Sequence, residues 1–272
     1  MRLSIGVLAK AFNLSDEALR YYEKKGFLHP RREGSGGYRV FEKADIQRIA
    51  NIKRLQNQDF SLDEILSVYS GAGEADLTGL YQQKVERVRR EIAYRQRMLA
   101  HLEETVALLE RLPGSLNQPE RVGLDTVYLL EYPSIDAMWA RITKEPLLKH
   151  LFQHLPLTSF TTIVPKAAAA GDLSQVRKGI LLRRQDAKVL EVDVSQMRAI
   201  DARLAVSCLF RVENGLFDVR GPLSLALNYL ESQGLTLSDD LFTIQLVNFI
   251  DGSDRPVHYS RLLAPIAAQP AS

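Results

Sequence analysis

Residues 17–28 read Glu17-Ala18-Leu19-Arg20-Tyr21-Tyr22-Glu23-Lys24-Lys25-Gly26-Phe27-Leu28, and this stretch decides the fold of the first part of the chain. Before it, apolar residues recur at helical spacing from Ile5 to Phe12, and the apolar face resumes after a short break. The pattern predicts two short helices joined by a tight turn. Ser15 is a favourable N-cap and Gly26 a natural end, so we expect the second helix over about residues 16–25.

The outer side of this second helix carries hydrogen-bond donors long enough to reach base edges or phosphates in a major groove. These donors are Arg20, Tyr21, Lys24 and Lys25. Three arginines, at 31, 32 and 39, then flank the glycine-rich run 34–37, which can turn a β-hairpin because glycine accepts positive φ. We expect a basic wing beside the second helix. A charged helical module for protein interaction is the alternative that this spacing leaves open.

The distribution of charge favours a nucleic-acid partner for the first part of the chain. Residues 1–56 hold 12 Lys and Arg against 6 Asp and Glu, whereas the remaining residues hold 23 against 27. A formal net charge of +2 for the whole chain therefore hides a basic head on a slightly acidic body. Basic charge concentrated on one module is typical of a nucleic-acid binder.

Four motifs in order resemble the MerR family of bacterial transcription regulators: Ile5 to Lys10, Leu19 to Leu28, Gly37 to Phe41, and Phe60 to Ile65. The resemblance implies a winged helix-turn-helix DNA-binding domain over residues 1–75. It also implies that DNA is contacted by Ser4, Ile5, Ser15, Ala18, Arg20, Tyr21, Lys24, Arg31, Arg32, Tyr38 and Arg39.

Length and composition limit the class of protein. With 272 residues and 46% hydrophobic residues, the chain can bury sizeable cores, and the length favours two domains. The single cysteine, Cys208, excludes an intramolecular disulfide and suits a reducing compartment. Neither a signal peptide nor an apolar run of spanning length is present, so we expect a cytoplasmic protein.

Two helices are expected after the wing. Residues 44–57 form an amphipathic pattern with a basic outer side, and this helix should pack beneath the second helix. Ser61 and Glu64 have the spacing of a capping box, which predicts a further helix that ends near Gly71.

Residues 77–112 contain no proline and predict one long helix, the core of a dimerisation segment over 76–113. Its apolar stripe follows the alternating spacing of a coiled coil, interrupted by Arg95. The stripe consists of Tyr81, Val85, Val88, Ile92, Leu99, Leu102, Val106 and Leu109. A helix about 54 Å long needs a partner. The chain's own C-terminal domain is one candidate; resemblance to the MerR family implies antiparallel pairing with a second copy, and so a homodimer.

A linker over 114–121 is expected from the proline and glycine content, followed by a second domain over 122–272. Strands are predicted over 122–132, 159–164, 179–184, 189–194, 203–212, 241–250 and 257–266, and helices after Ser134, Pro146 and Gly221. Two similar strand-helix-strand-strand halves would form one antiparallel sheet with helical layers. The fold class is therefore α+β, with a winged head, a coiled coil and this sheet domain.

This order of elements resembles the GyrI-like effector-binding domain, and in particular that of MerR regulators which sense lipophilic cationic drugs. By order, Trp139, Phe160, Phe242 and Tyr259 match the aromatic positions that line the pocket of those relatives. Aromatic faces suit flat or cationic lipophiles. Core packing is the alternative role for each of the four.

One position departs from the drug-sensing relatives. They place a glutamate on the last strand where this chain has Arg261. Either another carboxylate supplies the charge or the ligand is neutral or anionic, because an uncompensated buried cation is costly. The candidate carboxylates are Glu131, Glu191, Asp193 and Asp240.

Catalytic, metal and cofactor sites are not predicted. His150 and His154 could share a metal, but no third ligand is placed by sequence, and residues 77–119 lack the cysteines of metal-sensing MerR proteins. Ser174 and Ser207 lack the glycine elbow of a hydrolase.

Two functions remain. The favoured one is a ligand-responsive activator that binds promoter DNA as a homodimer and takes a lipophilic, cationic or uncharged, drug-like ligand. As the family resemblance implies, it distorts an over-long promoter spacer on binding the ligand, so that RNA polymerase holoenzyme engages both promoter hexamers. The alternative is a GyrI-like hydrolase of lipophilic compounds with an autoregulatory DNA-binding head.

Overall fold

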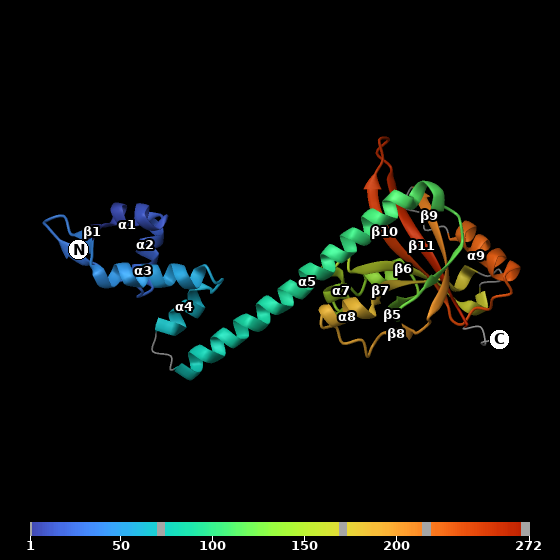
Figure 1. Ribbon diagram of the computed structural model, residues 1–272, viewed down its shortest axis with the longest axis horizontal. Helices are drawn as coiled ribbons and strands as arrows, with labels where there is room; N and C mark the ends of the chain where they lie inside the picture. Colours follow the sequence, from blue (N-terminus) through green and yellow to red (C-terminus); the bar gives the residue numbers. More distant parts are fainter. Residues whose placement is uncertain (1, 70–73, 169–172, 214–218, 268–272) are drawn as a thin grey trace. The chain divides into compact units, whose positions relative to one another are not determined.

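The computed structural model describes residues 2–69, 74–168, 173–213 and 219–267 (Figure 1). The chain forms two compact units, residues 1–90 and 91–272. Helix α5 (Glu74–Ser115) contributes its first part to one unit and its second part to the other. None of the described helices is long and apolar enough to cross a membrane.

The first unit begins with the two short helices that the sequence predicts. These are α1 (Ile5–Phe12) and α2 (Asp16–Lys24). The Ser15 hydroxyl accepts a hydrogen bond from the Ala18 backbone N–H at 3.0 Å, and Gly26 follows α2 with a φ of +81°. Both ends of α2 therefore have the predicted cap residues.

The predicted wing is a hairpin of β2 (Arg31–Glu33) and β3 (Tyr38–Phe41). A two-residue strand, β1 (Leu3–Ser4), adds to β3 and was not predicted, because so short a segment has no periodicity of its own. Helices α3 (Lys43–Gln56) and α4 (Leu62–Tyr69) follow. The capping box before α4 is present, with Ser61 N–H bonded to Glu64 and Glu64 N–H bonded to Ser61; the predicted end near Gly71 lies outside the described residues.

The core of the first unit joins the helix-turn-helix to the wing and α3. Leu8, Leu19, Phe27, Phe41 and Ile49 are among its most buried side chains. Because α1, α2, β3 and α3 all contribute, burial of this core holds the exposed side of α2 in a fixed orientation.

The second unit is one eight-stranded antiparallel sheet in the order β4-β9-β11-β10-β6-β7-β5-β8. Its strands are β4 (Glu120–Gly123), β5 (Val127–Tyr132), β6 (Thr158–Val164), β7 (Arg177–Arg183), β8 (Arg198–Ile200), β9 (Leu204–Glu213), β10 (Leu241–Ile250) and β11 (Pro256–Ile266). Its helices are α6 (Ile135–Trp139), α7 (Pro146–Gln153), α8 (Arg184–Val189) and α9 (Arg220–Ser232), with short 3-10 turns at Lys166–Ala168 and Leu173–Gln175. The two strand-helix-strand-strand halves follow the predicted order.

Three predicted boundaries in the second unit are wrong. The strand expected over 122–132 is two strands, because β4 pairs with β9 whereas β5 pairs with β7 and β8. The strand expected over 189–194 is absent: residues 184–189 form α8, whose Asp186 and Ala187 are buried against other elements. Helix α5 continues past Leu112 to Ser115, so the linker is shorter than predicted.

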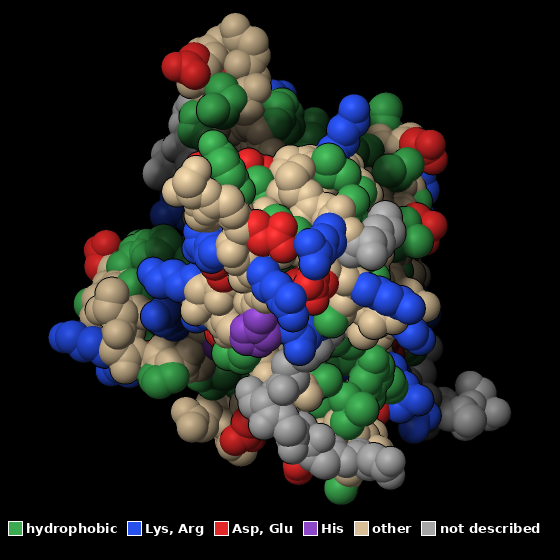
Figure 2. Space-filling model, turned by 90° about the vertical axis from the view of Figure 1, so that its left-hand side faces the viewer, with side chains coloured by type: hydrophobic (Ala, Val, Ile, Leu, Met, Phe, Trp, Pro, Cys, Tyr) green, Lys and Arg blue, Asp and Glu red, His purple; other side chains and the backbone are tan. Residues whose placement is uncertain are grey.

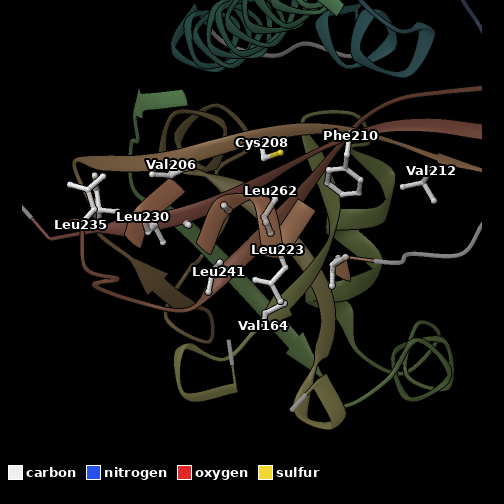
Figure 3. Close-up of a cluster of buried hydrophobic side chains, with 14 residues drawn as sticks. Val164, Val206, Cys208, Phe210, Val212, Leu223, Leu230, Leu235, Leu241 and Leu262 are labelled. Carbon is white, nitrogen blue, oxygen red and sulfur yellow. The ribbon is translucent and has the colours of Figure 1, made fainter. Parts of the chain in front are cut away.

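Side chains alternate between the two faces of the sheet, and each face has its own core. Val206, Cys208 and Leu262 pack against Leu223 and Leu230 of α9 (Figure 3). Residues one position along, such as Leu263, point to the opposite face, since successive side chains of a strand alternate. We call the face that packs against α9 the helix face and the other the open face. The second part of α5 reaches the open face through Leu108, whereas Tyr94 and Met98 pack against the cluster that contains Leu148 and Leu151 of α7.

Candidate functional site

The exposed side of α2 carries the predicted DNA contacts. Arg20, Tyr21 and Lys24 are exposed, whereas Leu19 and Tyr22 on the opposite side are buried. Lys25 Nζ lies 5.6 Å from the centre of the Tyr21 ring. Figure 2 shows Lys and Arg side chains over one face of the protein, interspersed with Asp, Glu and apolar side chains. The arrangement presents donors from one rigid helix, as insertion into a major groove requires.

Glu23 joins α2 to the wing, a contact that no pattern in the sequence indicates. Its carboxylate accepts hydrogen bonds from Arg39 Nε at 2.6 Å and from Arg32 at 3.0 Å. Arg39 is half-buried, so its charge is largely satisfied within the protein. Arg31 remains well exposed beside Glu42, with an Nε to carboxylate distance of 3.3 Å. Arg39 therefore positions the wing, and Arg31 offers its charge to solvent or phosphate.

The remaining predicted DNA contacts occupy the same unit but have different roles within it. Ser4 precedes α1 as its exposed N-cap residue, and Ile5 packs partly against the core. Ser15 is engaged in the helix cap, and Ala18 is half-buried beside it. Tyr38 is 75% exposed next to the turn of the wing, where it pairs with Glu33.

The apolar stripe on α5 is uncovered in the monomer. All eight members, from Tyr81 to Leu109, have between 39% and 57% of their surface exposed. A different side of α5 packs on the sheet unit, where Arg97, Leu108 and Leu112 are buried. The stripe is thus not the surface by which the helix docks on its own C-terminal domain.

Trp139 and Phe160 line a groove of about 400 Å³ on the helix face of the sheet. Their ring centres are 6.2 Å apart, and Phe152 lies 5.2 Å from both rings. We call this the aromatic groove; its lining is Ile135, Trp139, Phe160, Thr161, Thr162, Lys178, Gly179, Gln245 and Asn248. Burial lowers the pKa of Lys178, whose amino group donates to Thr162 at 2.8 Å. The groove combines aromatic and polar lining residues, and Lys178 is the one ionisable group among its described lining residues.

The other predicted ligand residues lie elsewhere. Phe242 is fully buried in the core of the open face, and Tyr259 stacks on Phe249 with ring centres 5.9 Å apart. Arg261 points to the open face, away from the aromatic groove. Of the four predicted aromatic residues, Trp139 and Phe160 therefore lie together. Phe242 and Tyr259 do not join them, because a strand side chain points to the face that its position along the strand determines.

A second cavity, of about 380 Å³, lies between α5 and the open face. We call it the helix–sheet cavity. Arg111, Arg183 and Arg261 line it together with Glu104, His101 and Asp125. Burial lowers the pKa of Arg261, and Arg183 adds to that effect. The sequence indicated Arg261 as a candidate, but not Arg111 and Glu104 of α5 or Arg183 at the end of β7.

The carboxylates considered as partners for a cationic ligand line neither cavity. Glu131 and Asp240 are held in ion pairs by Arg177 and Arg198, at 2.5 to 3.0 Å. Asp193 accepts hydrogen bonds from Ser195 at an exposed turn, and Glu191 is exposed.

Histidines 150 and 154 stack edge-on, with ring centres 4.7 Å apart. Within the described ranges, no group of three or more His, Cys, Asp or Glu side chains could hold a metal ion.

Comparison with known proteins relates the helix-turn-helix unit to a family of regulatory proteins. The family model for the MerR HTH family regulatory protein matches residues 3–70. The mercuric resistance operon regulatory protein of Pseudomonas fluorescens is 34% identical over 120 residues, which cover 43% of this chain and 83% of that protein. The transcriptional regulator BrlR of Pseudomonas aeruginosa is 35% identical over 111 residues, covering 39% of this chain and 41% of BrlR.

Among solved structures, the EcmrR–DNA complex aligns over 98% of this chain and all of that chain, at 15% identity and a TM-score of 0.38. The identity to the mercuric resistance regulator extends over most of that relative, and the family model covers the winged helix-turn-helix. This chain belongs to the MerR family of helix-turn-helix regulatory proteins and is a DNA-binding transcription regulator.

Proposed function

We propose that this protein is a ligand-responsive transcription activator that binds promoter DNA as a homodimer. The observation that carries the proposal is that α5 is shared: residues 74–90 belong to the DNA-binding unit, and residues 91–115 are packed into the sheet unit. A change in how the sheet unit holds α5 therefore reaches the DNA-binding unit through a continuous helix.

The uncovered stripe supports the homodimer. Eight large apolar side chains repeat along α5 with coiled-coil spacing while another side of the helix is already packed. A regular row of exposed apolar side chains is normally buried against a complementary surface. A second copy of the same helix supplies such a surface. Two copies of α2 at a fixed separation suit a two-fold operator.

The activating step follows the mechanism implied by the family resemblance. The dimer binds an over-long promoter spacer, and the ligand-bound form untwists and kinks it so that RNA polymerase holoenzyme engages both hexamers. Bending DNA costs several kcal/mol, on the order of 1 to 6 for a short site. The ligand offsets this cost only by binding more tightly to the state that distorts DNA.

The aromatic groove supports a lipophilic ligand in a GyrI-like effector domain. Trp139 and Phe160 offer ring faces, and Lys178 rather than a carboxylate is the charged lining group. A cation would face an amino group there, so the lining favours neutral or anionic lipophiles.

The hydrolase alternative lacks support from the candidate nucleophiles. Burial raises the pKa of Cys208 to about 11, so its thiol stays protonated. The neighbouring residue Ser207 is also buried, so its hydroxyl is not accessible to a substrate.

In vitro transcription from the gene's own upstream region, with a panel of cationic, neutral and anionic lipophiles, tests the proposal. We expect the protein to bind this DNA with and without ligand, and transcription to rise with at least one neutral or anionic compound. Binding without any ligand-dependent change in transcription would contradict a sensor. Conversion of the ligand to product during the assay would favour the hydrolase.

A further inference from the structure

The helix–sheet cavity has a basic end and an aliphatic body. Arg111 on α5, Arg183 at the end of β7 and Arg261 on β11 supply the basic end. The aliphatic lining consists of Leu108, Val122, Leu124, Val127, Ile244, Leu246 and Leu263. Its volume of about 380 Å³ lies within the roughly 300 to 1,000 Å³ of small-molecule sites.

Arg261 makes no ion pair or hydrogen bond with a carboxylate among the described residues, although Glu120 and Glu104 lie near enough to offset part of its charge. On β11 it is in register with Ile244 on β10 and with Leu209 on β9, both of which are buried apolar residues. Its Nε is buried without a hydrogen-bond partner. A half-buried guanidinium with an unsatisfied Nε is costly, and the like charges of Arg183 and Arg111 increase that cost, whereas Glu120 and Glu104 reduce it. An anion beside Arg261 would remove both penalties.

Glu104 is one of the acids that partly balance the cavity, with Asp125 in the lining and Glu120 near Arg261. One carboxylate oxygen accepts from Arg183 at 2.8 Å, and the other accepts from Arg97 at 3.3 Å. Glu104 is therefore divided between two arginines and makes no recorded hydrogen bond to Arg261. The ion pairs run from the cavity, through Glu104, to the buried contact between Arg97 and Asp186.

We propose that the helix–sheet cavity binds an amphipathic anion, whose carboxylate pairs with Arg261 and Arg183 and whose aliphatic tail fills the apolar lining. Two N–H groups of one guanidinium match a carboxylate in geometry, and such charge-assisted hydrogen bonds are the stronger kind. The site is separate from the aromatic groove, which opens on the other face of the sheet.

Binding of the anion at this site would also change how α5 is held, an inference that rests on the proposed function. The incoming carboxylate competes with Glu104 for Arg183, and Glu104 lies on α5, the helix that carries the apolar stripe. Occupancy of the cavity therefore changes how α5 is held on the sheet. Binding energy that depends on this change is what an effector needs in order to shift the state of the DNA-binding unit.

Calorimetric titration of the full chain with three probes that share one tail and differ in head group tests the proposal. The probes are octanoate, 1-octanol and octyltrimethylammonium, each below its micellar concentration. We expect octanoate to bind at least about tenfold more tightly than either of the others, because hydrogen bonds to charged groups contribute about that factor or more. Equal affinities for the three probes would overturn the proposal without any mutation.

Variants locate the binding. Arg261→Gln should weaken octanoate binding by about ten- to a hundredfold, Arg261→Lys by less, and Arg255→Gln, outside the cavity lining, should have no effect. Glu104→Gln should strengthen octanoate binding several-fold, because it removes the competing carboxylate. A loss of binding in Glu104→Gln, or normal binding in Arg261→Gln, would contradict the site.

The outcome is separable from that of the proposed function. If octanoate fails to bind while a neutral lipophile quenches Trp139 and raises transcription, the anion site is wrong and the sensor stands. If octanoate binds as described but no ligand alters transcription, the anion site stands and the activator proposal fails.

Discussion

Arg97 on α5 donates from Nε to the Asp186 carboxylate on α8 at 2.5 Å, and both side chains are buried. Burial raises the pKa of Asp186, and the guanidinium of Arg97 opposes that rise. The pair joins the helix with the exposed stripe to the sheet unit at a point remote in sequence. It is the tightest polar attachment that we find between them in the described parts of the chain.

Removing one partner of this pair should destabilise the sheet unit strongly. Arg97→Met leaves Asp186 as a buried, unpaired carboxylate, and such a change costs about 3 to 5 kcal/mol. The double variant Arg97→Met with Asp186→Leu should recover much of that loss, since no charge is left buried. Urea unfolding measures both, and a single variant as stable as the native protein would show that the pair is unimportant.

On α2, Arg20→Ala should weaken binding to the operator by about 1 to 3 kcal/mol if Arg20 contacts a base edge. Binding to scrambled DNA should change much less. Arg31→Ala in the wing should instead weaken binding to both DNAs alike and flatten the salt dependence, as loss of a phosphate contact does. Fluorescence anisotropy at several salt concentrations distinguishes the two, and unchanged operator affinity in Arg20→Ala would refute its assignment.

The stripe on α5 should hold the dimer. Val88→Asp with Leu102→Asp places two carboxylates among the apolar residues of the proposed seam, where their desolvation opposes pairing. Analytical ultracentrifugation should then show a monomer. Gln83→Asp with Gln96→Asp, at exposed positions off the stripe on the same helix, is the matched control and should leave the dimer intact. A dimer that survives the first double change would place the interface elsewhere.

Trp139 should report ligand in the aromatic groove. It is the single tryptophan and is 45% exposed, so a lipophilic aromatic compound that stacks on it should quench or shift its emission. Trp139→Ala should weaken that binding by roughly 1 to 3 kcal/mol and leave operator binding without ligand unchanged. If no compound that alters transcription changes the Trp139 emission, the ligand binds outside this groove.

The sheet unit should lose stability in mild acid. Burial lowers the pKa of His154, with His150 nearby as a second cause, and burial also lowers the pKa of His101 and His258. Below about pH 6.5 the unfolded chain takes up protons that the folded chain resists, so the free energy of unfolding falls as pH falls. His154→Gln should reduce this dependence between pH 7.5 and 5.5, whereas His29→Gln, exposed in the first unit, should not. Thermal melts at the two pH values provide the measurement.

Local features were accessible from the sequence because neighbouring residues determine them. The cap by Ser15, the end of α2 at Gly26, and the Ser61–Glu64 capping box each depend on contacts within a few positions along the chain. The spacing of the α5 stripe is equally local, and its members are exposed as a group. Periodicity likewise predicted the long strands β10 and β11 almost to the residue.

Tertiary structure alone decided which distant residues meet. Residues 184–189 form a helix rather than leading into a strand, since Asp186 pairs with Arg97 and Ala187 is buried, contacts that no local pattern encodes. Glu23 became the link between α2 and the wing because the hairpin places Arg39 beside it. Phe160 and Arg261 lie in different cavities because strand pairing and the alternation of side chains direct them to opposite faces of one sheet, and Trp139 reaches the cavity of Phe160 from α6.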